Sequence, residues 1–113
     1  MAYQSRLQEP MVDDLFQAVL CLGSQEDCYR FFEDLCTVGE IKAMAQRWRV
    51  VRMLTENRTY ADIIKETGVS TATISRVKKC LHYGADGYNT VIERYLRHEA
   101  SEDSEDEDKE GKP

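Results

Sequence analysis

Proline is nearly absent from this 113-residue sequence and occurs only at positions 10 and 113. Alternating runs of β-branched residues are also missing, so no segment has the pattern of a strand. No stretch approaches the roughly 18 consecutive apolar residues of a membrane span, and the N-terminus lacks a basic segment followed by an apolar run. These absences predict an all-α, cytoplasmic protein with no membrane partner.

Metal-ligand spacing is missing too. The four cysteines form no CxxC pair and no Cys and His cluster of the spacing that binds zinc, so we expect no metal site. Cys21, Cys28 and Cys36 are seven and eight residues apart, which places them on one face of a helix. That spacing predicts buried, reduced thiols.

Catalytic patterns are scarce as well. The two histidines are His82 and His98, and neither lies near a suggestive serine, cysteine or acid, apart from Cys80 beside His82. The sequence has no glycine-rich phosphate loop and no HExxH motif. We therefore expect that the protein is not an enzyme.

Charge is distributed unevenly along the chain, whose formal net charge is −6. Residues 101–113 hold seven acidic residues and two lysines, which leaves residues 1–100 with a net charge of only −1. We expect residues 1–100 to form one helical domain and residues 101–113 to be a disordered acidic tail, because the tail has too few apolar residues to fold. The tail is interpreted either as a solvated segment or as an electrostatic competitor for a basic surface.

A basic segment runs from Lys42 to Lys79, with nine Lys and Arg residues against three acidic ones. This local balance of +6 suits a surface that faces nucleic-acid phosphates. An ordinary solvated set of helix faces would carry the same charges. The charge alone leaves both interpretations open.

Capping residues and apolar spacing predict about six helices. Ser24 is a helix N-cap, Thr37 and Glu40 form a capping box, and Thr59 with Asp62 forms an approximate one. In the fourth helix we expect both Ile63 and Ile64 to face inward. The predicted helices begin near Pro10, Ser24, Thr37, Thr59, Ser70 and Gly87.

The segment from Thr59 to Lys79 has the pattern of a helix-turn-helix. Glycine at position 68 permits the left-handed backbone of a sharp turn, and Val69 and Ile74 hold the two helices together. Ser70 caps the second helix, whose first turn is then able to enter a major groove. The stretch GVSTATISRV resembles the turn and recognition helix of bacterial repressors of the lactose-repressor type.

Helical geometry assigns roles to the side chains of that second helix. With Ser70 as its cap, Thr71, Ala72 and Ser75 are placed to face base edges of double-stranded DNA. Its remaining polar side chains are placed to contact phosphates. These are Thr73, Arg76 and Lys79.

The stretch from Leu35 to Lys79 also resembles the tryptophan repressor family, and the whole sequence is similar to its YerC/YecD group. The shared residues are Thr37, Glu40, Ala43, Arg47, Arg49, Gly68, Ala72, Thr73, Ile74 and Arg76. The resemblance implies a six-helix subunit that intertwines with a second copy to form an obligate homodimer. It also implies a sequence-specific transcriptional repressor.

The same resemblance implies a small-molecule corepressor site. The positions that sandwich an indole ring in the tryptophan repressor are Arg47 and Arg76, and Thr37 is carried over with them. Two positions depart from that pattern: Val77 replaces a glycine beside the ring, and Cys80 replaces a serine that helps hold the amino group. Tryptophan, a different small effector and ligand-independent binding therefore stay open.

A rival to DNA binding is a protein-interaction module, in which the same helix pair packs against polymerase or another regulator. The two interpretations differ in what the exposed face of the helix pair carries. Cations gathered with the second helix favour DNA, whereas an apolar exposed face favours a protein partner.

Overall fold

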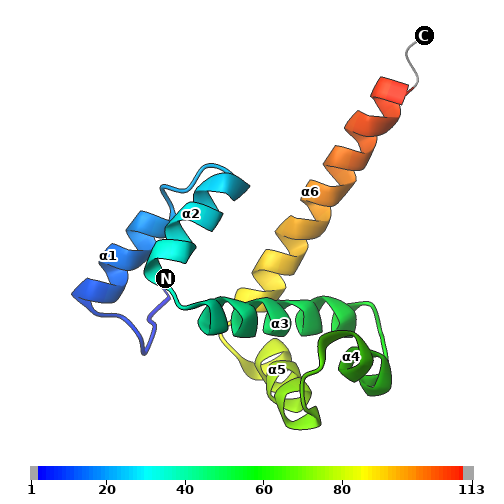
Figure 1. Cartoon of the computed structure of the whole chain (residues 1–113), viewed down its shortest axis with the longest axis horizontal. Coiled ribbons are helices and arrows are strands. Elements are labelled where there is room, and N and C mark those ends of the chain that lie inside the picture. Colours follow the sequence, from blue (N-terminus) through cyan, green and yellow to red (C-terminus); the bar gives the residue numbers. More distant parts are fainter. Residues whose placement is uncertain (1–2, 111–113) are drawn as a thin grey trace. The chain divides into compact units, whose positions relative to one another are not determined.

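The computed structural model describes residues 3–110, with side chains described through residue 101 (Figure 1). Within this range the chain forms six helices and no strand, which confirms the predicted all-α class. None of the described helices is long and apolar enough to cross a membrane. The helices are α1 (Pro10–Val19), α2 (Gln25–Leu35), α3 (Val38–Thr55), α4 (Tyr60–Thr67), α5 (Thr71–Tyr83) and α6 (Gly87–Glu110). They belong to two compact units, Met1–Ile41 and Lys42–Pro113.

The first unit contains two well-formed helices without a buried core. Proline occupies the start of α1, and the Ser24 hydroxyl accepts a hydrogen bond of 3.1 Å from the Asp27 amide at the start of α2, as predicted. Neither helix contains a buried residue. The predicted burial of Cys21 and Cys28 is wrong for the single chain, because both thiols are exposed. Helical spacing indicates a common face, but not what covers it.

The predicted capping box at the start of α3 is confirmed. The Thr37 amide donates to the Glu40 carboxylate at 2.9 Å, and the Glu40 amide donates to the Thr37 hydroxyl at 3.1 Å. Two hydrogen bonds hold the pKa of Glu40 below its usual value. The larger effect comes from the Thr37 amide and the smaller one from the Thr37 side chain. The carboxylate is thus stabilised where α3 begins.

The second unit has the core that the first lacks. It is built from Val50, Val51 and Met53 of α3, with one or two residues each from α4 and α5, and Figure 1 shows those two helices on one side of α3. In α4 the prediction was half wrong: Ile63 is fully buried, whereas Ile64 is 38% exposed. Adjacent residues of a helix point in directions about 100° apart, so one core-facing stripe does not accommodate both. The buried residues outside α3 are Ile63, Ile74 and Val77.

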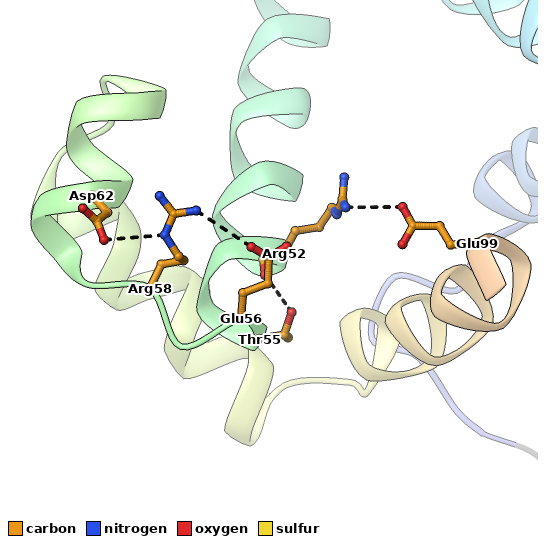
Figure 2. A network of polar contacts seen from close by, with 6 residues as sticks. All are labelled: Arg52, Thr55, Glu56, Arg58, Asp62 and Glu99. Atoms are coloured by element: carbon orange, nitrogen blue, oxygen red, sulfur yellow. Dashed lines mark hydrogen bonds and ion pairs between the residues drawn. The ribbon is translucent and has the colours of Figure 1, made fainter. Parts of the chain in front are cut away.

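Aromatic and charged contacts attach α6 to α3. The rings of Trp48 and Tyr95 meet edge to face with centroids 5.8 Å apart. The guanidinium of Arg52 lies 4.7 Å from the centre of the Tyr95 ring. It also lies 3.5 Å from the Glu99 carboxylate, an ion pair that Figure 2 shows. Since Tyr88 and Ile92 also pack against the core, the first half of α6 forms part of the second unit.

The last turns of α6 are formed by residues of the predicted acidic tail. The backbone is helical through Glu110, so α6 includes residues 101–110 of the predicted acidic tail. No glycine or proline occurs between residues 88 and 110, and Glu and Lys are good helix formers. Residues 111–113 of the predicted tail lie outside the described residues.

Candidate nucleic-acid interface

The turn between α4 and α5 has the geometry that the sequence predicts. Gly68 adopts the left-handed conformation, with φ of 75°, and its amide donates to the Ile64 carbonyl at 2.8 Å, which ends α4. The Thr67 hydroxyl donates to the Ile63 carbonyl at 2.7 Å and accepts from the Val69 amide at 3.3 Å. Val69 then packs against the core. The direction in which the chain enters α5 is therefore fixed by backbone and side chain together.

The start of α5 is capped by Ser70, as predicted. Its hydroxyl accepts a hydrogen bond of 3.2 Å from the Thr73 amide and lies 3.2 Å from the Thr73 hydroxyl. The cap satisfies one of the amides that every helix start leaves without an intrahelical partner. Ser70, Thr71 and Ala72 are exposed, so the positive end of the helix dipole lies at the surface, which suits an approach to phosphates.

The α5 helix has two distinct faces. Ile74 is fully buried and Val77 is only 2% exposed, and both pack against α3 and α4 in the core. The opposite face carries small or basic side chains that are all exposed. They are Thr71, Ala72, Ser75, Arg76 and Lys79. Thr73 lies between the two faces and is half-buried.

Most cations of the basic segment are free of acidic partners. Of its nine Lys and Arg residues, Arg52 and Arg58 form ion pairs with carboxylates. Among the described side chains, the other seven have no carboxylate within ion-pair distance: Lys42, Arg47, Arg49, Lys65, Arg76, Lys78 and Lys79. Positive charge that is not neutralised within the chain is available to nucleic-acid phosphates.

A pocket of about 400 Å³ lies between α3 and α5. It brings together four of the five residues of the predicted ligand site, namely Arg47, Arg76, Val77 and Cys80. Thr37, the fifth residue, does not line the pocket, and its amide and hydroxyl are engaged in the capping box with Glu40. Because Val77 is almost wholly buried, it forms a wall of this pocket rather than an accessible contact.

Sequence analysis missed several residues that line the same pocket. Gln46 is one of them, and its side-chain amide donates to the Thr67 carbonyl at 3.1 Å, which ties α3 to the end of α4. Tyr88 contributes from α6. The available signal was helical spacing, since Ala43, Gln46 and Arg47 are three and four residues apart on one face of α3. No comparable signal predicts Tyr88.

Comparison with known proteins gives consistent matches over most of the chain. The family model described as Trp repressor protein matches residues 11–96. Protein YerC of Bacillus subtilis (strain 168) is 50% identical over 99 residues, which is 88% of this chain and 95% of that protein. A TrpR-like protein from Eubacterium eligens ATCC 27750 has a crystal structure with 52% identity and a TM-score of 0.77, covering 80% of this chain and 93% of that one. A candidate Trp repressor from Staphylococcus aureus has 47% identity and the same TM-score, covering 80% of this chain and 91% of its own.

Proposed function

This chain belongs to the Trp repressor family, a family of DNA-binding regulators, and from that premise we propose that it is a sequence-specific transcriptional repressor of the bacterial cytoplasm. The observation that carries the proposal is the two-faced α5 helix. Ile74 and Val77 anchor it in the core, while its opposite face is small, polar and basic. A face of that composition suits base edges and phosphates. The large apolar side chain exposed on α5 is that of Tyr83, at the opposite end of the helix from Ser70.

In the proposed complex, the capped end of α5 enters the major groove of double-stranded DNA. Thr71, Ala72 and Ser75 contact base edges, and the methyl groups of Thr71 and Ala72 are suited to thymine. Arg76 and Lys79 contact phosphates on either side of the groove. Ser70 acts through its cap on the helix, and the half-buried Thr73 contributes at the margin of the interface.

We also propose that the protein acts as a homodimer. Support comes from α1 and α2, which bury none of their own residues although they carry large apolar side chains. Phe16 is 52% exposed and Leu20 is 75% exposed. Short helices are marginal in water unless an apolar face is packed, so a second copy that covers these faces would stabilise both chains. Two copies would also present two α5 helices to successive major grooves.

The pocket between α3 and α5 is the proposed site of a small-molecule corepressor. Arg47 and Arg76 supply two guanidinium groups, which favour a ligand with a carboxylate or another anionic group. Tryptophan itself is disfavoured, because Val77 forms a wall of the pocket and the Cys80 thiol is a poor hydrogen-bond acceptor. Arg76 belongs to α5 and is exposed on the proposed DNA face, so a ligand that orders it would influence DNA contact directly.

The DNA proposal is tested by selecting duplexes from a random pool with the wild type and with variants of α5. Thr71→Ala and Ala72→Asp are expected to change or abolish the selected sequence. Lys79→Ala is expected instead to weaken binding to all sequences and to lower the salt slope by about one. Thr90→Ala, on the exposed side of α6, is the control and should select the wild-type sequence. An unchanged preference in the Thr71 and Ala72 variants would contradict the assigned base contacts.

The corepressor proposal is tested by calorimetry with single amino acids, tryptophan included, on the wild type and on Arg47→Gln. A ligand of this pocket should bind Arg47→Gln more weakly than the wild type. The ligand should also change the protein's affinity for the selected duplex, and the duplex should change the protein's affinity for the ligand by the same factor. Tight, stoichiometric binding of tryptophan would overturn the argument from Val77 and Cys80. If no amino acid or other carboxylate binds, ligand-independent DNA binding is supported instead.

A further inference from the structure

A second, larger cavity lies on the other side of α5 from the proposed corepressor pocket. Its volume is about 730 Å³, which falls in the range of roughly 300–1,000 Å³ typical of small-molecule sites. It shares no residue with the first pocket. The ends of α3 and α5, the start of α6 and the loop before α4 form its walls, through Leu54, Thr55, Asn57, Arg58, Tyr60, Lys78, Leu81, His82 and Asn89.

The lining of this cavity has the composition of an anion site. Arg58 and Lys78 are cationic, and the side chains of His82 and Asn57 add hydrogen-bond donors. The Thr55 hydroxyl and the Asn89 amide also line the cavity, but they donate to the Arg52 carbonyl and to Leu81 and Asp86, respectively. No acidic residue lines the cavity among the described residues. Carboxylates do approach Arg58, but from Glu56 and Asp62, which lie outside the lining. The lining itself therefore has donors and no acidic side chain, and Lys78 is its cation without a carboxylate partner among the described side chains.

Arg58 is held at the edge of the cavity by backbone and side chain. Its amide donates to the Met53 carbonyl at 3.0 Å, which closes the end of α3, and Asn57 before it has a positive φ of 60°. Its Nε lies 3.5 Å from the Asp62 carboxylate and one terminal nitrogen lies 4.0 Å from that of Glu56 (Figure 2). These contacts engage two of the three guanidinium nitrogens.

Lys78 supplies the second charge from α5. Its Nζ lies 5.9 Å from the centre of the Tyr60 ring, a cation-π contact, and no carboxylate of the described side chains pairs with it. His82 follows four residues later and therefore lies one helical turn along the same face. Lys78 and His82 are thus aligned on α5 with Arg58 across the cavity.

The cavity continues onto the proposed DNA face. Tyr60, Lys78 and His82 also line a shallower groove of about 400 Å³, whose other residues include Ser75 and Lys79. Ser75 and Lys79 are residues already assigned to base and phosphate contact. An anion in the cavity would therefore lie beside the path of a DNA strand along α5.

We propose that this cavity binds a phosphate group through Arg58 and Lys78, with His82 as a further donor. Two sources supply the same chemistry: a backbone phosphate of the bound DNA, or a free phosphorylated small molecule. The DNA source rests on the function proposed above, whereas the free source does not. Continuity with the groove of Ser75 and Lys79 places either phosphate where it bears on DNA binding.

The test compares Lys78→Gln with Lys65→Gln, which removes the same charge from an exposed position that lines neither cavity nor groove. In the first arm, sodium pyrophosphate is titrated at constant ionic strength while backbone amide shifts are recorded by NMR. A free-phosphate site gives saturable shifts at Arg58, Lys78 and His82, weakened about fivefold or more in Lys78→Gln and unchanged in Lys65→Gln. Thermal melts of both variants check that they remain folded.

The second arm measures binding of a random-sequence duplex at several salt concentrations. A backbone-phosphate contact predicts that Lys78→Gln lowers the salt slope by about one, and that Lys65→Gln changes it less. Saturable pyrophosphate binding supports a free phosphorylated molecule as the ligand. A lower salt slope of DNA binding in Lys78→Gln, with no saturable pyrophosphate binding, supports a backbone phosphate of DNA. If Lys78→Gln matches Lys65→Gln in both arms, the cavity proposal is overturned. The repressor proposal survives that result as long as Lys79→Ala still weakens DNA binding.

Discussion

The two compact units of this chain form helices equally well and bury their residues very differently. In the unit Lys42–Pro113, three helices contribute to a core of six buried residues. In the unit Met1–Ile41, α1 begins with a proline, α2 is capped by Ser24, and both helices are strongly amphipathic, but no described residue is buried. The difference teaches that local signals fix where a helix forms, whereas the burial of its apolar face depends on what is available to cover it. We expect the first unit to obtain that cover from a second copy.

The comparison predicts that core substitutions in the second unit have the largest effect on stability. Ile63→Ala is expected to lower the free energy of unfolding by about 2–5 kcal/mol, because the side chain is fully buried. The neighbouring Ile64→Ala makes the same chemical change at a 38% exposed position, and we expect a loss below about 1 kcal/mol. Urea unfolding of the two variants measures the difference. If both variants lower the free energy of unfolding equally, Ile64 is buried in the assembled protein and the expected difference between the two positions is wrong.

A charge placed on the first unit is expected to act on association. Phe16→Asp puts a carboxylate on the apolar face of α1 and should weaken the dimer by about 2 kcal/mol, or roughly thirtyfold. Gln17→Asp introduces the same charge at the next, polar position and should leave the dimer intact. Sedimentation over a range of micromolar concentrations gives both dissociation constants. A wild type that sediments as a stable folded monomer would contradict the comparison itself.

The same distinction explains how far the sequence predicted this structure. Ser24, Thr37 with Glu40, and Ser70 were identifiable as caps because a cap is made within four residues of chain. The turn at Gly68 was predictable for the same reason. The four ligand-site residues that meet in the pocket came from the family resemblance, not from spacing.

Burial was predicted less well, because it depends on contacts between segments. Cys21 and Cys28 share a face with apolar residues, yet both are exposed in the single chain. Tyr88 and Asn89 reach the two cavities only because α6 packs back onto α3, and no local pattern of the sequence specifies that packing. The cavity of Arg58 and Lys78 was missed for the same reason, since its residues come from four separate segments.

Two glycines, one from each unit, sharpen the comparison at the level of the backbone. Both have open space where a Cβ would lie, but only Gly68 has a positive φ. Gly68→Ala is expected to lower stability by about 1–2 kcal/mol through backbone strain and to weaken DNA binding by misdirecting α5. Gly39 lies within α3, where alanine is a better helix former than glycine, so Gly39→Ala should raise stability by up to about 1 kcal/mol. Thermal unfolding measures both, and a loss at Gly39 as large as that at Gly68 would indicate that a partner chain packs against Gly39.

The smallest expected effect is a pH dependence at the start of α3. The pKa of Glu40 is lowered in the folded chain, so its carboxylate contributes stability above its ordinary pKa of 4.5 and loses that contribution as the pH falls through the folded value. Glu40→Gln keeps a neutral hydrogen-bonding side chain in the capping box. The wild type should therefore be more stable than the variant at pH 7, and in urea unfolding the two should converge as the pH falls below 4.5 and through the folded pKa. A difference that does not change with pH would exclude the carboxylate charge as its cause.

The most direct test of the account is the symmetry of the DNA sequence that the wild-type protein selects from a randomised pool. A first unit that pairs two chains, and a second unit that presents α5, together predict a two-fold symmetric motif with half-sites about one helical turn apart. If both half-sites are bound by one dimer, scrambling the sequence of either half-site should abolish binding of the protein to the duplex. Selection of an asymmetric single half-site would contradict the dimer, and the absence of any enriched sequence would contradict the central claim that α5 reads DNA.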